Sequence, residues 1–197
     1  MNQRDLKQLW YLNYHNPISI KEKLRIQMWR IVELLLFKPS PHLFSGWRVF
    51  ILKCFGAKIG KGCFISPKAE IFMPWNLELG NFSAIDNYVY IKNKVKITIE
   101  DYVSIATHTQ IIPGGHDVKS RQFASDLAPV RIRNGAFIGS STFIGKGVTI
   151  GQMCVIGARS VVLKDMPENY ICFGHPCKPI APRLEKETYE NFRYNYL

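Results

Sequence analysis

The chain has 197 residues, of which 47% are hydrophobic and 21% are charged, and it carries 26 Lys and Arg residues against 15 Asp and Glu residues. This composition excludes a disordered or fibrous protein, and the length fits one domain with at most a small appendage. The longest strongly apolar run, residues 31–37, contains Glu33 and is far shorter than the roughly 20 residues that span a bilayer, so we do not expect a transmembrane protein.

Two further features set the expected compartment. The first residues lead into no uninterrupted apolar stretch followed by a cleavage site, so we expect no signal peptide and a cytoplasmic protein. The five cysteines are odd in number and scattered, without the paired spacing of a zinc site, so we expect reduced cysteines that fill the core and no bound metal.

The amino-terminal region, residues 1–58, is expected to be helical and strongly basic. It contains ten basic and three acidic residues, a net charge of +7. Ser19 and Glu22 form a capping box, which predicts the start of a helix that ends at residues 38–39, and a shorter helix is expected over residues 47–56. The first of these helices carries an apolar face formed by Leu24, Met28, Ile31, Val32 and Leu35.

Two roles are open for these helices. In the favoured one, they cover an open edge of the fold that follows. In the other, the positive charge together with Trp10, Trp29 and Trp47 brings the region into peripheral contact with an anionic membrane, at its inner face. No nucleic-acid-binding motif accompanies the charge, so we expect no nucleic acid partner.

From residue 59 onward, aliphatic residues recur every six positions. The register holds at Ile59, Ile65, Ile71 and Leu77, then at Leu79, Ile85, Ile91 and Ile97, then at Ile99, Ile105 and Ile111, and finally at Ile132, Ile138, Ile144, Ile150, Ile156 and Val162. Four residues after most of these positions stands a small or β-branched residue, and glycine often follows the aliphatic residue directly.

A period of six does not fit an α-helix, but it fits short strands whose side chains alternate in direction. Three hexads then make one coil of a triangular prism, with the aliphatic residues inside and the glycine permitting the turn at a corner. The two-residue slips at 77–79 and 97–99 lengthen a coil from 18 to 20 residues. We therefore predict an all-β solenoid of parallel strands over residues 59–181.

Between Ile111 and Ile132 the hexads stop, and residues 113–131 form a long loop. A loop of this length in a compact repeat protein is functional or disordered, and its basic and aromatic residues favour function. Within it, His116 follows two glycines and precedes Asp117. A histidine can exchange a proton near neutral pH, as a general base must.

Four segments carry a family resemblance: residues 73–77 (MPWNL), 115–117 (GHD), 156–167 (IGARSVVLKDMP) and 174–180 (GHPCKPI). Together with the hexads, they resemble the hexapeptide-repeat acyltransferases, and most of all the colanic-acid-type exopolysaccharide and sugar O-acetyltransferases. The resemblance covers roughly residues 19–183. It implies a left-handed parallel β-helix with an amino-terminal helical appendage (1–58), a β-helix (59–181) and a short carboxy-terminal helix (182–197).

The resemblance also implies a reaction and a site. The expected activity is transfer of an acetyl group from acetyl-CoA to a hydroxyl of a sugar, with His116 as general base, in a homotrimer with active sites between subunits. Asp86, Asn87 and Asp117 are the candidate acceptor-binding residues, although position 86 in the related galactoside enzymes is an asparagine. The candidate coenzyme-binding residues are Gly139, Ser140, Gly157, Ala158, Ser160, Leu163, Lys164, Lys178 and Arg183.

Two other functions are weighed against this one. A γ-type carbonic anhydrase has the same fold but needs three histidines around zinc, and His108 and His116 would supply only two. A scaffold or binding solenoid without catalytic activity is the other alternative. The sequence specifies neither the sugar and its hydroxyl nor the length of the acyl group.

Overall fold

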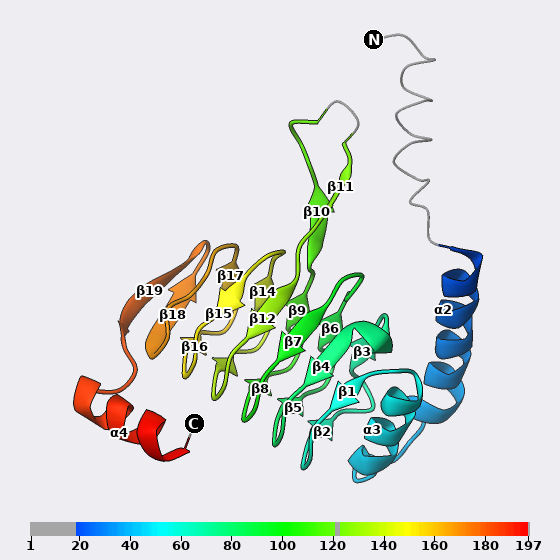
Figure 1. Cartoon of the computed structure of the whole chain (residues 1–197), viewed down its shortest axis with the longest axis horizontal. Helices are drawn as coiled ribbons and strands as arrows, with labels where there is room; N and C mark the ends of the chain where they lie inside the picture. The colour runs from blue at the N-terminus through cyan, green and yellow to red at the C-terminus, as the bar shows by residue number, and fades with distance from the viewer. Residues whose placement is uncertain (1–18, 121–122, 197) are drawn as a thin grey trace.

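A computed structural model describes residues 19–120 and 123–196 of the chain, and its main body is a parallel β-solenoid (Figure 1). Each coil contributes one strand to each of three sheets, which we number in chain order. Sheet 1 contains β1 (Lys58–Ile59), β4 (Leu77–Leu79), β7 (Ile97–Ile99), β12 (Val130–Ile132) and β15 (Thr149–Ile150). Sheet 2 contains β2 (Phe64–Ile65), β5 (Ala84–Ile85), β8 (Ser104–Ile105), β13 (Phe137–Ile138), β16 (Val155–Ile156), β18 (Tyr170–Gly174) and β19 (Cys177–Pro182). Sheet 3 contains β3 (Glu70–Ile71), β6 (Tyr90–Ile91), β9 (Gln110–Ile111), β14 (Phe143–Ile144) and β17 (Val161–Val162).

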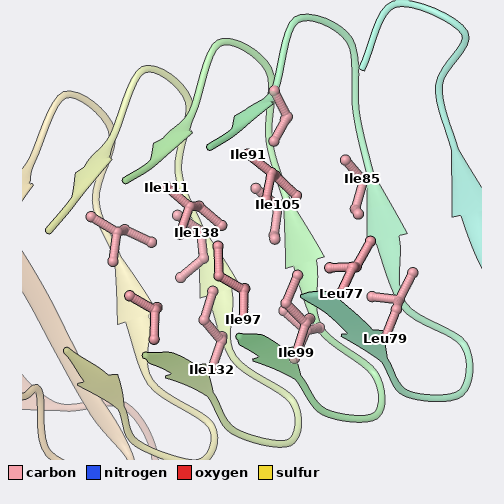
Figure 2. Close-up of a cluster of buried hydrophobic side chains, with 14 of the residues drawn as sticks. Leu77, Leu79, Ile85, Ile91, Ile97, Ile99, Ile105, Ile111, Ile132 and Ile138 are labelled. Atoms are coloured by element: carbon pink, nitrogen blue, oxygen red, sulfur yellow. The ribbon is translucent and has the colours of Figure 1, made fainter. Parts of the chain in front are cut away.

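The predicted hexads are confirmed as the core of the solenoid. The aliphatic positions point inward and are almost completely buried, and Ile105 and Ile138 have no exposed surface. Figure 2 shows ten of these Leu and Ile side chains stacked along the inside of the coils. The predicted coil lengths are also confirmed, because Glu78 pairs with Thr98, 20 residues on, and Arg131 pairs with Thr149, 18 residues on.

Three rows of turns join the sheets and form the corners of the prism. The first corner links sheet 1 to sheet 2 (residues 60–63, 80–83, 100–103, 133–136 and 151–154), and the second links sheet 2 to sheet 3 (66–69, 86–89, 106–109, 139–142 and 157–160). The third corner links sheet 3 back to sheet 1 and includes residues 72–76, 92–96, 112–129, 145–148 and 163–165.

The glycine after the aliphatic residue has a different role from the one expected. The left-handed turn conformation falls two residues later, at Tyr88 and His108 for example, whose φ angles are 59° and 61°. The glycines are required for close stacking of the coils instead, since a Cβ atom on Gly139 would lie 2.5 Å from the backbone nitrogen of Ala158.

The amino-terminal helices lie across one end of the coil (Figure 1). They are α2 (Ile20–Val32), which continues into one π-helical stretch, η1 (Glu33–Phe37), and α3 (Ser45–Cys54); a 3-10 turn, η2 (Pro74–Asn76), lies in the first coil. The predicted cap is confirmed, because the Ser19 hydroxyl accepts a hydrogen bond from the Glu22 backbone N–H at 3.2 Å. Trp10 lies outside the described residues.

The apolar face noted in the sequence of this helix is turned outward, except for Val32, which packs against the core. Leu24, Met28, Ile31 and Leu35 are 57–63% exposed, whereas Ile26, Trp29 and Phe37 on the opposite side are buried. Trp29 determines this orientation, because its indole N–H donates to the Ile71 carbonyl at 2.7 Å while its ring packs edge-on against Phe37. The helix therefore covers the first coil through its aromatic side and leaves the aliphatic side outward.

Arg48 anchors α3 to the coil. Its side chain is completely buried, and its guanidinium donates hydrogen bonds to the Ile65, Pro41 and His42 carbonyls at 2.6–2.7 Å. Burial lowers the pKa of Arg48 from its usual value, but three carbonyl acceptors and the Ser40 hydroxyl at 3.0 Å compensate for its lost hydration.

The other end of the coil finishes with an antiparallel pair, β18 and β19, and the predicted single carboxy-terminal helix is α4 (Lys186–Tyr196). The sulfur atoms of Cys154 and Cys172 lie 3.7 Å apart in the core here as free thiols. Burial raises the pKa of the Cys154 thiol far above its ordinary range, so this cysteine is an inert packing residue. Within the described residues, no helix has the length and apolar character needed to cross a bilayer.

Candidate active site

The interruption in the hexads folds as a β-hairpin that projects from the third corner (Figure 1). Its strands are β10 (Gly114–His116) and β11 (Ser125–Leu127), with His116 opposite Ser125. The base of the hairpin is tied to the next coil, because Gly147 N–H donates to the Ala128 carbonyl at 3.2 Å and Lys146 forms an ion pair with Asp126. The solenoid therefore holds a protruding two-stranded arm at a fixed place along its length.

His116 is exposed, but Phe123 holds its ring in one orientation. The Nδ1 atom lies 2.9 Å from the Phe123 carbonyl oxygen, and the two rings stack with their centroids 4.5 Å apart and their planes 4° from parallel. A carbonyl oxygen can only accept, so this hydrogen bond requires the proton of a neutral imidazole on Nδ1. The Nε2 atom then carries the lone pair, which is the state a general base needs.

Asp117 stabilises the hairpin turn. Its Oδ1 atom accepts hydrogen bonds from the backbone N–H groups of Lys119 at 2.9 Å and Ser120 at 3.3 Å. One carboxylate oxygen of Asp117 is therefore occupied by hydrogen bonds within the turn, although the side chain is exposed to solvent.

Asp86 and Asn87 lie at the second corner, whereas the hairpin leaves from the third. The Oδ1 atom of Asp86 accepts from the Asn87 backbone N–H at 2.6 Å, and the Oδ1 atom of Asn87 accepts from the Ser66 hydroxyl at 2.6 Å. These bonds fix both side chains at the partly exposed edge between sheets 2 and 3. Within the described residues, no hydrogen bond joins either of them to the hairpin that carries His116.

Seven of the nine candidate coenzyme-binding residues fall on two corners. Gly139, Ser140, Gly157, Ala158 and Ser160 are at the second corner, and of these Ala158 is exposed and Ser140 partly exposed. Leu163 and Lys164 are exposed at the third corner, which they share with the base of the hairpin. The structure thus brings Leu163 and Lys164 to the corner from which the hairpin of His116 leaves, but not the five residues of the second corner.

Three of the candidate coenzyme contacts have close partners within the chain itself. The Ser160 hydroxyl is buried and donates to the Gly157 carbonyl at 2.6 Å, so it shapes the turn and is turned away from solvent. Gly157 keeps the coils close, since a Cβ atom there would lie 2.8 Å from the Cβ of Phe173. Arg183 donates from Nη1 to the Gly135 and Met153 carbonyls at 3.2 and 3.1 Å at the first corner, where it fastens the carboxy-terminal segment to the coil.

Lys178 is the remaining cationic candidate beyond the last coil. It is exposed on β19, in register with Phe173 of β18. Lys164 and Lys178 are therefore both available for an anionic ligand.

Sequence reasoning did not single out Phe123, which holds the imidazole by its carbonyl and its ring. Its position follows from the pairing register of the hairpin, and the only signal was an aromatic residue in an otherwise polar loop. His108, the other histidine weighed for a zinc site, is exposed and stacked on Tyr88, with ring centroids 4.8 Å apart. In the part of the chain that the structure describes, no three His, Cys, Asp or Glu side chains gather in an arrangement that would hold a metal ion.

Comparison with known proteins places this geometry among acetyltransferases. The chain is 36% identical over 164 residues to the Escherichia coli protein named as a colanic acid biosynthesis acetyltransferase, WcaF, covering 83% of this chain and 90% of that protein. It is 32% identical over 152 residues to the galactoside O-acetyltransferase of Escherichia coli, covering 74% of this chain and 73% of the relative. No family model matches the chain.

Solved structures of the same architecture include a galactoside acetyltransferase in complex with coenzyme A, with a TM-score of 0.78 and 24% identity over 100% of this chain and 96% of that one. A hexapeptide-repeat acetyltransferase from Vibrio cholerae, complexed with acetyl coenzyme A, also gives a TM-score of 0.78, at 21% identity over 94% of this chain and 100% of the other. These similarities confirm that the solenoid is a left-handed parallel β-helix.

Proposed function

The chain belongs to the hexapeptide-repeat acetyltransferases, and on this premise we propose that it transfers the acetyl group of acetyl-CoA to a hydroxyl of a sugar, with His116 as general base. The acceptor in this proposal is a precursor of a cell-surface or exopolysaccharide glycan. Residues 59–181 form the catalytic unit, with residues 1–58 and 182–197 as appendages, and the protein works in the cytoplasm.

The observation that carries the proposal is the hydrogen bond between His116 Nδ1 and the Phe123 carbonyl. It leaves Nε2 free to take the proton of the acceptor hydroxyl as its oxygen attacks the thioester carbonyl carbon. The C–O bond forms, the C–S bond breaks, and Nε2 returns the proton to the departing sulfur. The thioester supplies an activated acyl group, so a positioned base and the correct geometry are sufficient.

The coenzyme fits the exposed edges of sheet 3. Ala158 and Ser140 present small side chains and backbone at the second corner, where an amide-bearing arm can approach closely. Leu163 is exposed at the third corner, next to Gly145 of the turn that follows the hairpin, and offers an apolar contact. The ammonium groups of Lys164 and Lys178 can pair with phosphates. Ser160 and Arg183 are left out of the contact set, because internal hydrogen bonds already engage both side chains.

The separation of His116 from Asp86 and Asn87 supports an oligomer. These residues lie at different corners of one prism, so a neighbouring prism that packs beside the hairpin would bring its second corner toward the imidazole. In this proposal the protein is a homotrimer, and each acceptor site combines His116 and Asp117 of one subunit with Asp86 and Asn87 of another.

The test is release of coenzyme A, followed with a thiol reagent during incubation with acetyl-CoA and candidate nucleotide-linked or lipid-linked sugars. An acetyltransferase releases coenzyme A only with its acceptor, and mass spectrometry then shows the acceptor heavier by one acetyl group. A scaffold protein releases none with any acceptor. Carbon dioxide hydration that is abolished by a chelator would replace the proposal with the carbonic anhydrase alternative.

A further inference from the structure

The outer surface of the amino-terminal helices is apolar. Leu24, Ile31 and Leu35 of α2 and η1 are 60%, 57% and 63% exposed, and Phe44 and Phe50 at α3 are 58% and 57% exposed. With Trp47, which is 42% exposed, these six residues define what we call the outer helical face. Scattered exposed apolar residues are ordinary, but a group this large on adjacent elements marks an interaction surface.

The outer helical face is continuous across both helices. Trp47 of α3 donates from its indole N–H to the Leu36 carbonyl at 3.1 Å, and its ring stacks on Phe50 with centroids 5.9 Å apart. Between η1 and α3 lies an open hollow of about 440 Å³ lined mainly by Leu35, Leu36, Pro39, Pro41, Phe44 and Trp47. The helices face the coil through Trp29 and Arg48, so this surface points away from the solenoid.

The charges around this face have one sign. Between residues 19 and 56 there are six exposed basic residues, besides the buried Arg48, and two acidic ones, Glu22 and Glu33, which are both partly buried. Glu33 lies 3.9 Å from Lys38, so the ammonium group of this lysine offsets its negative charge. Lys21 and Lys23 are exposed and flank the stripe that contains Leu24 and Ile31 on a helical projection.

We infer that the outer helical face docks on an anionic phospholipid membrane, with α2 and α3 lying in the plane of the lipid headgroups. Aliphatic residues and aromatic rings between flanking lysines are the composition of an interfacial helix. Each lysine near such a surface adds electrostatic attraction to the anionic headgroups. A second copy of the same face fits less well, since a self-complementary contact would bring two rims of positive charge together. The inference does not depend on the identity of the acyl acceptor.

The experiment is flotation of the full chain with two sets of vesicles, one of phosphatidylcholine alone and one with 30% phosphatidylglycerol. We expect binding to the anionic vesicles that falls at least tenfold in 0.5 M NaCl, because salt screens the lysines. The double variant Ile31→Ser with Leu35→Ser removes apolar contacts, and Lys21→Glu with Lys23→Glu reverses the charge. Each pair is expected to lower binding roughly tenfold or more. All four side chains are exposed, so the fold is retained.

A matched control uses exposed apolar residues elsewhere on the molecule, Phe82→Ser with Ile180→Ser, which are 56% and 55% exposed in the parent chain. This variant should float with the anionic vesicles as the parent chain does. Equal flotation of the parent and both helical variants, or of the parent with neutral and anionic vesicles, would overturn the inference. So would the absence of vesicle binding together with an oligomer that dissociates in the Ile31 and Leu35 variant, which would assign the face to a second copy.

Discussion

In the coil, Ile105 and Ile138 are completely buried and pair in register between neighbouring turns, whereas in the hairpin that leaves the third corner His116 and Asp117 are exposed. Each turn of the coil packs on its neighbours in the same way and stabilises the next turn. The hairpin interrupts that repeat and is attached through a few contacts near Ala128 and Lys146. The comparison shows that regular stacking holds the hairpin in place, while the segment that leaves the stack carries His116, the proposed general base.

The strongest test of this division is His116→Ala. The general base is lost, so turnover is expected to fall by about 10² to 10⁴. Binding of coenzyme A and the thermal midpoint should stay close to those of the parent chain, since the imidazole is outside the core. Steady-state kinetics, coenzyme titration and thermal unfolding measure the three effects. Near-normal turnover would remove His116 from the mechanism and with it the role assigned to the hairpin.

The converse change is Ile138→Ala in the coil. It leaves a cavity between two turns and should lower the free energy of unfolding by about 2–5 kcal/mol. Turnover by the fraction that remains folded should be close to normal. Denaturant unfolding measures the free energy of unfolding, and activity per folded molecule measures turnover. A large loss of activity without loss of stability would contradict the separation of scaffold and site.

Within the hairpin, Phe123→Leu tests how much the ring of this positioning residue contributes, separately from its backbone carbonyl. The hydrogen bond to Nδ1 remains available, but the ring stacking is lost, which is worth about 0.5–1.5 kcal/mol. Turnover should fall about two- to tenfold. A purely structural role would instead lower the thermal midpoint. The KM for acetyl-CoA is expected to be unchanged, and Phe123→Tyr should restore the parent rate.

The smallest effect concerns the outside of the coil. Glu78 lies 2.7 Å from Lys96 and 3.0 Å from Lys58, and hydrogen bonds from Lys96 first and then Lys58 lower its pKa. A lowered folded-state pKa contributes stability above the unfolded value that disappears as the pH falls through the folded value. Glu78→Gln should therefore cost about 0.2–1 kcal/mol at pH 7 and nothing in strong acid. Thermal unfolding at both pH values checks this, with Glu190→Gln as the control; an equal loss at both would contradict the ion-pair explanation.

The sequence predicted the coil well, because a period of six leaves few alternatives once the aliphatic residues must be buried. It did not indicate which side of α2 packs against the coil, since this helix has apolar residues on both sides and the aromatic side is the one that lies against the coil. It also missed the part played by Phe123, which depends on a hairpin register that no repeat encodes. The guanidinium of Arg183 could not be assigned from motifs, because its carbonyl partners come from other turns. The Ser160 hydroxyl could not be assigned either, because it donates to the Gly157 carbonyl of its own turn and accepts from the Gly174 backbone N–H.

The equal spacing of the early coils has a consequence for how such a chain can change in length. Leu79 and Ile99 occupy equivalent places one coil apart, and each coil is paired only with its immediate neighbours. Excision or duplication of a complete 20-residue unit would preserve every remaining contact type and alter the rod by one strand spacing, about 4.8 Å. The molecule is in this sense modular, and the distance between its lipid-facing helices and its reactive arm is adjustable in whole steps.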